Sequence, residues 1–269
     1  MGGAHEQLDW YETPRYYDIV FAGDDAREGA FLSAVAREFG RTARRRGKLR
    51  VLEPACGSGR LVLEMARRGC AVTGFDGSDA MLAFARERLA ERGQRARLVK
   101  GRMERFDVGR GFDLAHCMVS TFKYLLDEES ARSNLRCVAR SLAPGGLYVI
   151  GIHLTQYEDR RRNRERWVAT RGATKVVCNI QGWPADRRTR LERTRSRLSV
   201  RERGRERRTE TEWMFRTYDW RQFRALVGSV AEFEHVATFD FNYRVDRPRL
   251  MPDDQLDCVF VLRKRGVRL

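Results

Sequence analysis

Apolar and polar residues in the first 153 positions follow two alternating spacings. Short apolar runs typical of buried strands are each followed by a stretch in which apolar residues recur every three or four positions, as in an amphipathic helix. This alternation predicts a parallel sheet with helices on both faces and ligands bound beyond the carboxyl ends of the strands. Strands are expected around residues 51–53 and at 71–76, 95–101, 112–119 and 146–153, and helices within 25–46, after Gly59, after Ser78 and over 127–142.

The alternation stops after residue 157. Thr189 to Arg201 keeps a period of two, Glu202 to Arg205 can turn the chain, and Arg205 to Tyr218 can return as a second strand. With a third strand at Trp167 to Ile180, these residues predict an antiparallel flap inserted after the fifth strand of the sheet. A helix at 219–227 and strands at 233–241 and 257–263 complete an α/β fold with a seven-stranded, mostly parallel, Rossmann-like sheet.

Four parts of the chain are therefore expected. They are 1–46, N-terminal helices; 47–157, the ligand-binding core; 158–217, the flap, a lid over the substrate; and 218–269, the last helix and two strands.

A glycine loop joins the first strand to its helix. Glycine allows sharp turns and close approach of a ligand to the backbone, and the first N–H groups of a helix are free to bind it. Glu53, at the tip of the strand, would repel a pyrophosphate but attract a cationic or zwitterionic ligand. The spacing of Gly57 and Gly59, without a third glycine, also departs from the dinucleotide fingerprint.

The second strand ends in Asp76, an acid suited to hold the two hydroxyls of a ribose. A ribose at Asp76 and an ammonium group near Glu53 are both present in S-adenosylmethionine. The two strand ends therefore predict this cofactor.

Five segments in the same order resemble class I S-adenosylmethionine-dependent methyltransferases, over roughly residues 10 to 153. Ala55 stands where that family usually has its first glycine. The segments are Val51–Gly59, Gly74–Leu82, Gly101–Asp107, Phe112–Met118 and Leu142–Ile150.

The resemblance implies a set of cofactor-binding residues. Tyr17 matches a segment that folds over the cofactor in this family, and Met118 is expected near the methyl group. The other expected contacts are Glu53, Ala55, Gly57 and Gly59 for the methionine end, Asp76 for the ribose, and Gly77, Met81, Arg102 and Met103 around the adenine. Packing in the core explains Met81 and Met103 equally well.

The stretch after the fourth strand bears on the acceptor. Met118 to Thr121 lacks the Asn/Asp-Pro-Pro-Tyr signature of enzymes that methylate exocyclic base amines or glutamine amides. Met118 to Leu125 is instead similar to sugar N,N-dimethyltransferases and glycine-type N-methyltransferases. This resemblance implies methylation of a small-molecule amine by direct displacement, which needs little acid-base help. If the acceptor were a hydroxyl, a base would be needed, and His153 is the first candidate and Tyr124 the second.

Charge is concentrated in the flap. Residues 158–208 carry 17 Arg and one Lys against seven acids, which is +11 of the net +16 of the chain. The arginines could hold an acidic group of the acceptor, track a nucleic-acid backbone, or reflect a GC-rich coding sequence. An RNA or nucleic-acid methyltransferase, a non-catalytic cofactor-binding module and a dehydrogenase remain alternatives.

Other features narrow the class of protein. The six cysteines are scattered, so neither a disulfide framework nor a zinc site is expected, and no metal is predicted. No apolar run has the length of a membrane span, which favours a soluble cytoplasmic protein.

Overall fold

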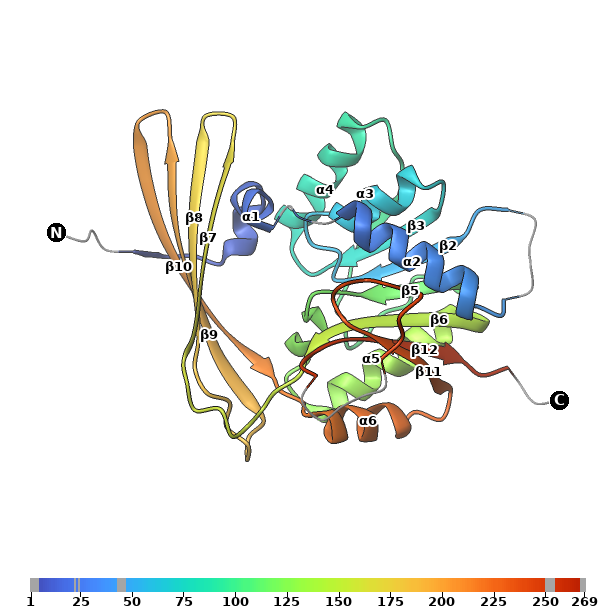
Figure 1. Ribbon diagram of the computed structural model, residues 1–269. Helices are drawn as coiled ribbons and strands as arrows, with labels where there is room; N and C mark the ends of the chain where they lie inside the picture. Colours follow the sequence, from blue (N-terminus) through green and yellow to red (C-terminus); the bar gives the residue numbers. More distant parts are fainter. Residues whose placement is uncertain (1–4, 22, 24, 43–46, 250–254, 267–269) are drawn as a thin grey trace.

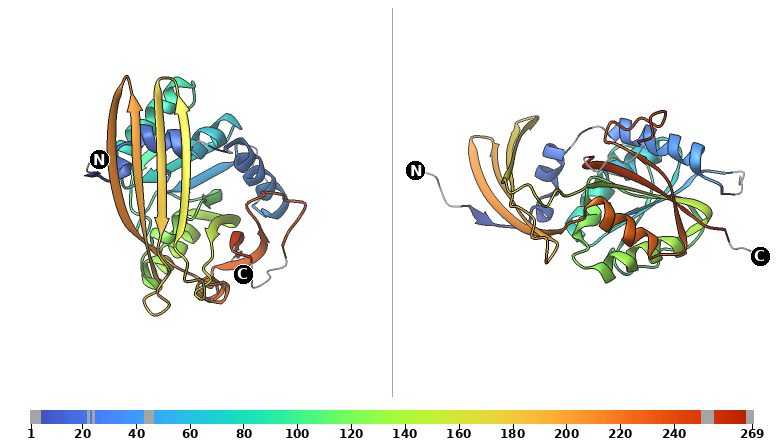
Figure 2. Two further views of the ribbon diagram at one scale, coloured as in Figure 1. Left: turned by 60° about the vertical axis from the view of Figure 1, so that its left-hand side comes forward. Right: turned by 60° about the horizontal axis from the view of Figure 1, so that its bottom comes forward.

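A computed structural model describes residues 5–21, 23, 25–42, 47–249 and 255–266. The chain forms a core of a twisted sheet between helices, and a second sheet, the flap, that stands beside it as a separate layer (Figures 1 and 2). The last residues of the range 25–46, within which a helix was predicted, lie outside the described residues, at 43–46.

The core sheet has seven strands in the order β11-β12-β6-β5-β2-β3-β4. All neighbours are parallel except β12, which runs antiparallel to both β6 and β11. The seven-stranded, mostly parallel fold predicted from the sequence is confirmed. The strands are β2 (Arg50–Pro54), β3 (Ala71–Asp76), β4 (Arg97–Lys100), β5 (Phe112–Cys117), β6 (Leu142–His153), β11 (Phe233–Phe239) and β12 (Asp257–Lys264).

Helices cover both faces of this sheet. On one face, α5 and α6 bury Leu135 and Phe223 in one apolar cluster, and on the other α2 and α3 bury Leu32 and Val62 in a second. The helices are α1 (Pro14–Phe21), α2 (Asp25–Phe39), α3 (Arg60–Arg67), α4 (Asp79–Glu91), α5 (Glu128–Ser141) and α6 (Trp220–Gly228), with short 3-10 helices η1 (Trp10–Glu12) and η2 (Thr121–Tyr124). None of these helices combines the length and apolarity needed to cross a lipid bilayer.

The flap is a five-stranded sheet in the order β1-β10-β9-β8-β7. Along β9 the predicted period of two is present: Thr194 and Leu198 are buried toward the core, whereas Arg193 and Arg197 lie on the outer face. The strands are β1 (Glu6–Gln7), β7 (Asn163–Arg171), β8 (Thr174–Gly182), β9 (Leu191–Glu202) and β10 (Arg205–Arg216).

The single strand predicted at Trp167 to Ile180 is wrong. The chain turns in the middle of this stretch, where Gly172 has a φ of +59°, and the two halves pair as the hairpin β7–β8. The short strand β1, which pairs parallel to β10, was not predicted either.

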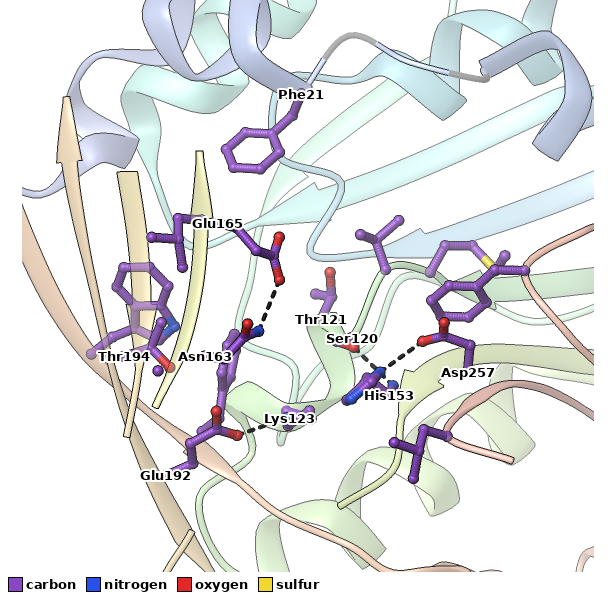
Figure 3. A pocket seen from close by; sticks show the side chains of 18 of the residues that line it. Phe21, Ser120, Thr121, Lys123, His153, Asn163, Glu165, Glu192, Thr194 and Asp257 are labelled. Carbon is purple, nitrogen blue, oxygen red and sulfur yellow. Dashed lines mark hydrogen bonds and ion pairs between the residues drawn. The ribbon is translucent and has the colours of Figure 1, made fainter. Parts of the chain in front are cut away.

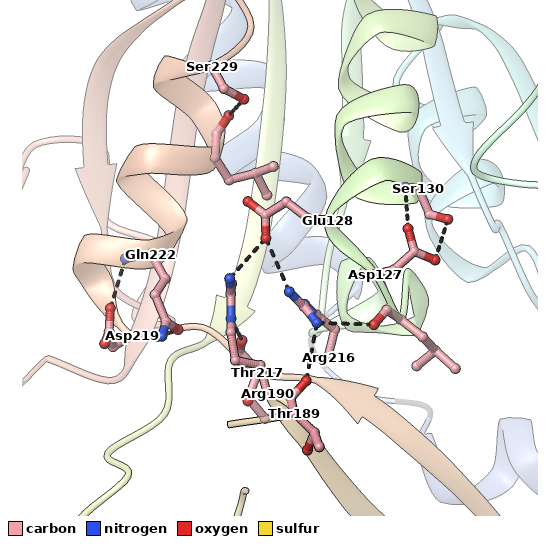
Figure 4. Close-up of polar contacts among 12 residues, drawn as sticks. Asp127, Glu128, Ser130, Thr189, Arg190, Arg216, Thr217, Asp219, Gln222 and Ser229 are labelled. Carbon is pink, nitrogen blue, oxygen red and sulfur yellow. Dashed lines mark hydrogen bonds and ion pairs between the residues drawn. The ribbon is translucent and has the colours of Figure 1, made fainter. Parts of the chain in front are cut away.

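Two elements hold the flap against the core. Helix α1 lies between the flap and α4 and contacts both (Figure 1). At the other end, one carboxylate oxygen of Glu128 on α5 accepts hydrogen bonds from Arg190, 2.9 Å away, and Arg216, 3.2 Å away (Figure 4). These arginines flank the β9–β10 hairpin, so Glu128 fixes its base.

Candidate functional site

A cavity of about 1090 Å³ separates the carboxyl ends of β2, β5 and β6 from the inner face of the flap (Figure 3). Because parallel strands end at the same edge of the sheet, residues far apart in sequence meet there. Of the residues predicted for the site, Tyr17, Glu53, Ala55, Gly57, Met118 and His153 line this cavity.

Glu53 is the unusual group of the core side. Its side chain is buried, and its Oε2 has no hydrogen-bond partner. Burial raises the pKa of the Glu53 carboxyl well above its usual range, an effect that the nearby Arg60 guanidinium opposes. Arg60 itself is held by Glu28, at 2.9 and 3.0 Å, and by Asp25, at 2.8 Å. A buried carboxylate with a free oxygen at a cavity wall suits a positively charged ligand.

The loop after Glu53 has the backbone expected of a ligand-binding turn. Ala55, Gly57 and Gly59 have φ angles of +50°, +52° and +72°. A Cβ atom at Gly57 would meet nothing within 4 Å, whereas at Gly59 it would lie 2.7 Å from the Cβ of Ala85. Gly57 therefore leaves open space in front of the loop, and Gly59 allows α3 to approach α4. Ala55 adopts a left-handed conformation that costs a non-glycine residue about 1–2 kcal/mol.

Asp76 is next to this loop but outside the lining of the cavity. Its two carboxylate oxygens accept hydrogen bonds from the backbone N–H groups of Gly57, at 2.8 Å, and Ser78, at 2.9 Å. Burial nevertheless raises the pKa of the Asp76 carboxyl. Asp76 thus accepts a hydrogen bond from Gly57, a residue of the cavity wall, but it does not itself line the cavity that Glu53 lines.

The residues predicted around the adenine lie beyond Asp76 and also outside the cavity lining. Met81 is fully buried and Met103 is 9% exposed. The Arg102 side chain is exposed and pairs with Glu104 at 2.5 Å. The short helix η1 packs against α4 here, and Gly59 also lies outside the lining.

Helix α1 joins the loop to the flap. Tyr17 lines the cavity, and burial raises the pKa of its hydroxyl to about 12. The next residue, Asp18, is 1% exposed. Its carboxylate accepts hydrogen bonds from Ser58 of the glycine loop, at 3.1 Å, and Arg171 of the flap, at 2.7 Å, and pairs with Arg88 of α4. One buried acid therefore connects the glycine loop, α4 and the flap.

His153 lies at the carboxyl end of β6, with half of its side chain exposed. Its Nδ1 is 2.7 Å from Oδ1 of Asp257, the residue opposite it on β12. Its backbone N–H donates to the Ser120 hydroxyl at 3.0 Å, as Figure 3 shows. With Nδ1 directed at a carboxylate, Nε2 is the ring nitrogen free to accept a proton.

Tyr124, the second candidate base, lies behind the cavity. Its hydroxyl accepts a hydrogen bond of 2.5 Å from the Tyr11 hydroxyl, and burial raises its pKa. It is not among the residues that line the cavity.

The flap was predicted from the sequence as a lid over the substrate, but the individual flap residues that line the cavity were not. The flap side of the cavity combines indole rings with carboxylates, and a buried Lys123 pairs with Glu192 at 3.2 Å. The alternating aromatic residues before Tyr218 could have indicated the lining residues of β10. The lining residues of β7 could not be predicted, because nothing in the sequence indicated the pairing of β7 with β8. The flap residues of the lining include Glu165, Trp167, Trp183, Glu192, Thr194, Trp213 and Phe215.

Comparisons with known proteins agree with this geometry. Residues 51–146 match the methyltransferase domain family. A dTDP-3-amino-3,6-dideoxy-alpha-D-glucopyranose N,N-dimethyltransferase of Streptomyces fradiae is 32% identical over 142 residues, which is 52% of each chain. Glycine N-methyltransferase of Rattus norvegicus is 32% identical over 120 residues, 40% of this chain and 41% of the relative.

The alignment to the curated relatives is partial, since the chain spans about half the length of those it matches. The similarity in fold to solved structures covers more of the chain than the sequence alignments do. A crystal structure of an S-adenosylmethionine-dependent methyltransferase from Clostridium acetobutylicum has a TM-score of 0.76 and 17% identity, with 96% of this chain and 99% of that chain covered. These similarities show that residues 51–146 match a methyltransferase domain, and that the chain has the fold of S-adenosylmethionine-dependent methyltransferases.

Proposed function

We propose that the protein transfers a methyl group from S-adenosylmethionine to an amine of a small molecule. The observation that carries the proposal is the unpartnered, buried Glu53 carboxylate, which lies in one cavity with the aromatic and acidic face of the flap. When bound, the cofactor supplies an electrophilic methyl group on a sulfonium. The chain must hold this group, orient the amine and exclude water.

The residues around the glycine loop fit the cofactor. Glu53 would hold its ammonium group, and Ala55, Gly57 and Gly59 would let it approach the backbone. Asp76 would exchange its hydrogen bond from the Gly57 N–H for the ribose hydroxyls. Gly77, Met81, Arg102 and Met103 would surround the adenine, with Tyr17 and Met118 beside the methionine end.

The flap favours an amine as the acceptor. Ammonium groups are attracted to carboxylates and to the faces of indole rings, and Glu165, Glu192, Trp167 and Trp213 all line the cavity. The Streptomyces fradiae relative, by its name, acts on an amino sugar. Amino sugars are therefore the first acceptor class to test.

The His153–Asp257 pair has a role that suits this acceptor. An amine is mostly protonated at neutral pH and must lose a proton before its lone pair can attack. Nε2 of His153 can take this proton, while Asp257 holds the ring through Nδ1 and stabilises the imidazolium.

A transfer assay tests the proposal. The protein is incubated with S-adenosylmethionine labelled in its methyl group and with pairs of sugars that differ only in an amine or a hydroxyl, and glycine is tested in parallel. We expect label on the nitrogen of amino sugars, loss of most transfer in His153→Gln, and normal transfer in His235→Gln, a histidine of β11 outside the cavity lining. Tight cofactor binding without transfer to any amine would contradict the proposal and favour a non-catalytic binding module.

A further inference from the structure

A second cavity, the arginine groove, lies on the outer face of the flap. Its volume is about 700 Å³. Six arginines and one carboxylate, Glu165, contribute to its lining, so it carries a strong positive charge. The lining residues are Arg162, Arg164, Glu165, Arg166, Asn179, Ile180, Gln181, Trp183, Arg193, Arg195 and Arg197.

Most of these arginines have no acid to neutralise them. Glu210 forms ion pairs with both Arg197, at 2.5 Å, and Arg195, at 3.7 Å. Within the described part of the chain, the other four, Arg162, Arg164, Arg166 and Arg193, form no ion pair. Arg193 instead lies over the Trp183 ring, 3.8 Å from its centroid, which fixes its guanidinium at the groove. Unpaired, pre-positioned guanidinium groups are suited to bind phosphate.

The arginine groove is continuous with the main cavity. Arg162, Arg164, Glu165, Ile180 and Trp183 line both. Strand β7, which carries two of these five and directly follows Arg162, forms the edge of the flap sheet, so no further strand separates the two spaces. A single extended molecule can therefore occupy both cavities.

The positive area is small. On the same outer face, β10 carries Glu206, Glu210 and Glu212 opposite Arg201, Arg197 and Arg195 of β9. Neighbouring strands are about 4.8 Å apart, so the charge changes sign within one strand of the groove. This pattern fits one or two phosphate groups better than the backbone of a nucleic acid, which needs a longer basic track.

We propose that the arginine groove is an anion subsite that holds a phosphate of the acceptor while the amine of the same molecule lies in the main cavity. The inference rests on the proposed function, because it assigns the acceptor to the phosphorylated small-molecule amines. Glu165 and Trp183, at the boundary, separate the two ends of this acceptor.

Calorimetric titration with inorganic pyrophosphate tests the subsite directly. We expect one site in the wild-type protein, with affinity roughly tenfold lower in each of Arg164→Gln and Arg193→Gln, because each loses a charge-assisted contact. The matched control is Arg205→Gln, an exposed flap arginine that does not line the groove. Binding of S-adenosylmethionine should be unchanged in all three variants.

Three results would overturn the inference. The first is no binding of pyrophosphate to the wild-type protein, or equal binding by the groove variants. The second is tighter binding of a 12-nucleotide RNA, with a salt dependence that indicates many phosphates, which would make the surface a nucleic-acid site. The third is a dimer in gel filtration that the groove variants dissociate. If pyrophosphate binds as expected but S-adenosylmethionine does not, the proposed function fails and the anion subsite stands.

Discussion

The buried Glu53 carboxylate destabilises the folded state of the ligand-free protein. A buried carboxylate oxygen without a partner loses its hydration, and Gln has the same shape without the charge. We expect Glu53→Gln to raise the free energy of unfolding of the ligand-free protein by about 1–3 kcal/mol near pH 8. Denaturant unfolding measures this, with Glu87→Gln, an exposed glutamate of α4, as the control.

The pH dependence of this effect has a defined sign. Because burial raises the pKa of Glu53 in the folded state, the folded protein binds a proton that the unfolded chain has released. The contribution of Glu53 to stability is therefore most favourable below the ordinary glutamate pKa, about 4.3, and falls as pH rises through the raised pKa. The stability difference between Glu53→Gln and wild type should grow from acid to neutral pH, and a difference that shrinks would contradict the assignment.

In the proposed mechanism, Asp257 acts through His153. Replacing it with Asn removes the charge and puts an N–H2 donor where only acceptors were, so that Nδ1 is no longer held as the donor, and we expect Asp257→Asn to lower kcat at neutral pH by about 10–100-fold. The KM for S-adenosylmethionine should stay within twofold. Raising the pH above the pKa of the acceptor amine should restore much of the rate, because the amine then needs no base. A defect independent of pH would show that the pair has only a structural role.

Glu53 could be predicted from the sequence because the strand, the acid and the glycine loop are consecutive. Asp257 could not, because its place beside His153 depends on the pairing of β6 with β12, about a hundred residues later in the chain. Lys123 was missed for a similar reason, since its partner Glu192 belongs to the flap.

At the scale of elements, the base of the flap depends on Glu128. Glu128→Ala leaves Arg190 and Arg216 without their shared acceptor at partly buried positions (Figure 4), and we expect a loss of about 1–3 kcal/mol in unfolding free energy. Hydrogen exchange should become faster in residues 189–218, and the KM of the acceptor should rise. Glu129→Ala, which changes an exposed neighbour, serves as the control. Equal exchange in both variants would show that Glu128 does not anchor the flap.

The core elements were predictable because apolar runs alternate with helical spacing and the glycine turns mark their junctions. The β7–β8 hairpin was not. Its turn, Arg171 to Ala173, contains one glycine and lacks the Asn-Gly or Asp-Gly pair that marks tight hairpins. Apolar residues on both sides of this turn, such as Val168 and Val176, therefore resembled one longer strand.

In the whole molecule, the cavity lies between two sheets, and helix α1 connects them. The predicted methionine end of the cofactor site, apart from Gly59, faces this cavity, whereas Asp76 and the predicted adenine residues lie outside its lining. The sequence places all of them at the carboxyl edge of one sheet. It does not specify how the N-terminal residues pack along that edge, because this depends on contacts of η1 and α1 with α4 and the flap.

The most direct test of the central claim is a calorimetric titration of S-adenosylmethionine into the wild-type protein and into Glu53→Gln, with a nicotinamide dinucleotide as the comparison ligand. We predict one site for S-adenosylmethionine, affinity about 10–100-fold weaker in Glu53→Gln because the ammonium group loses its carboxylate, and no binding of the dinucleotide. Binding of the dinucleotide in place of S-adenosylmethionine, or equal affinity of the two proteins for S-adenosylmethionine, would contradict the account.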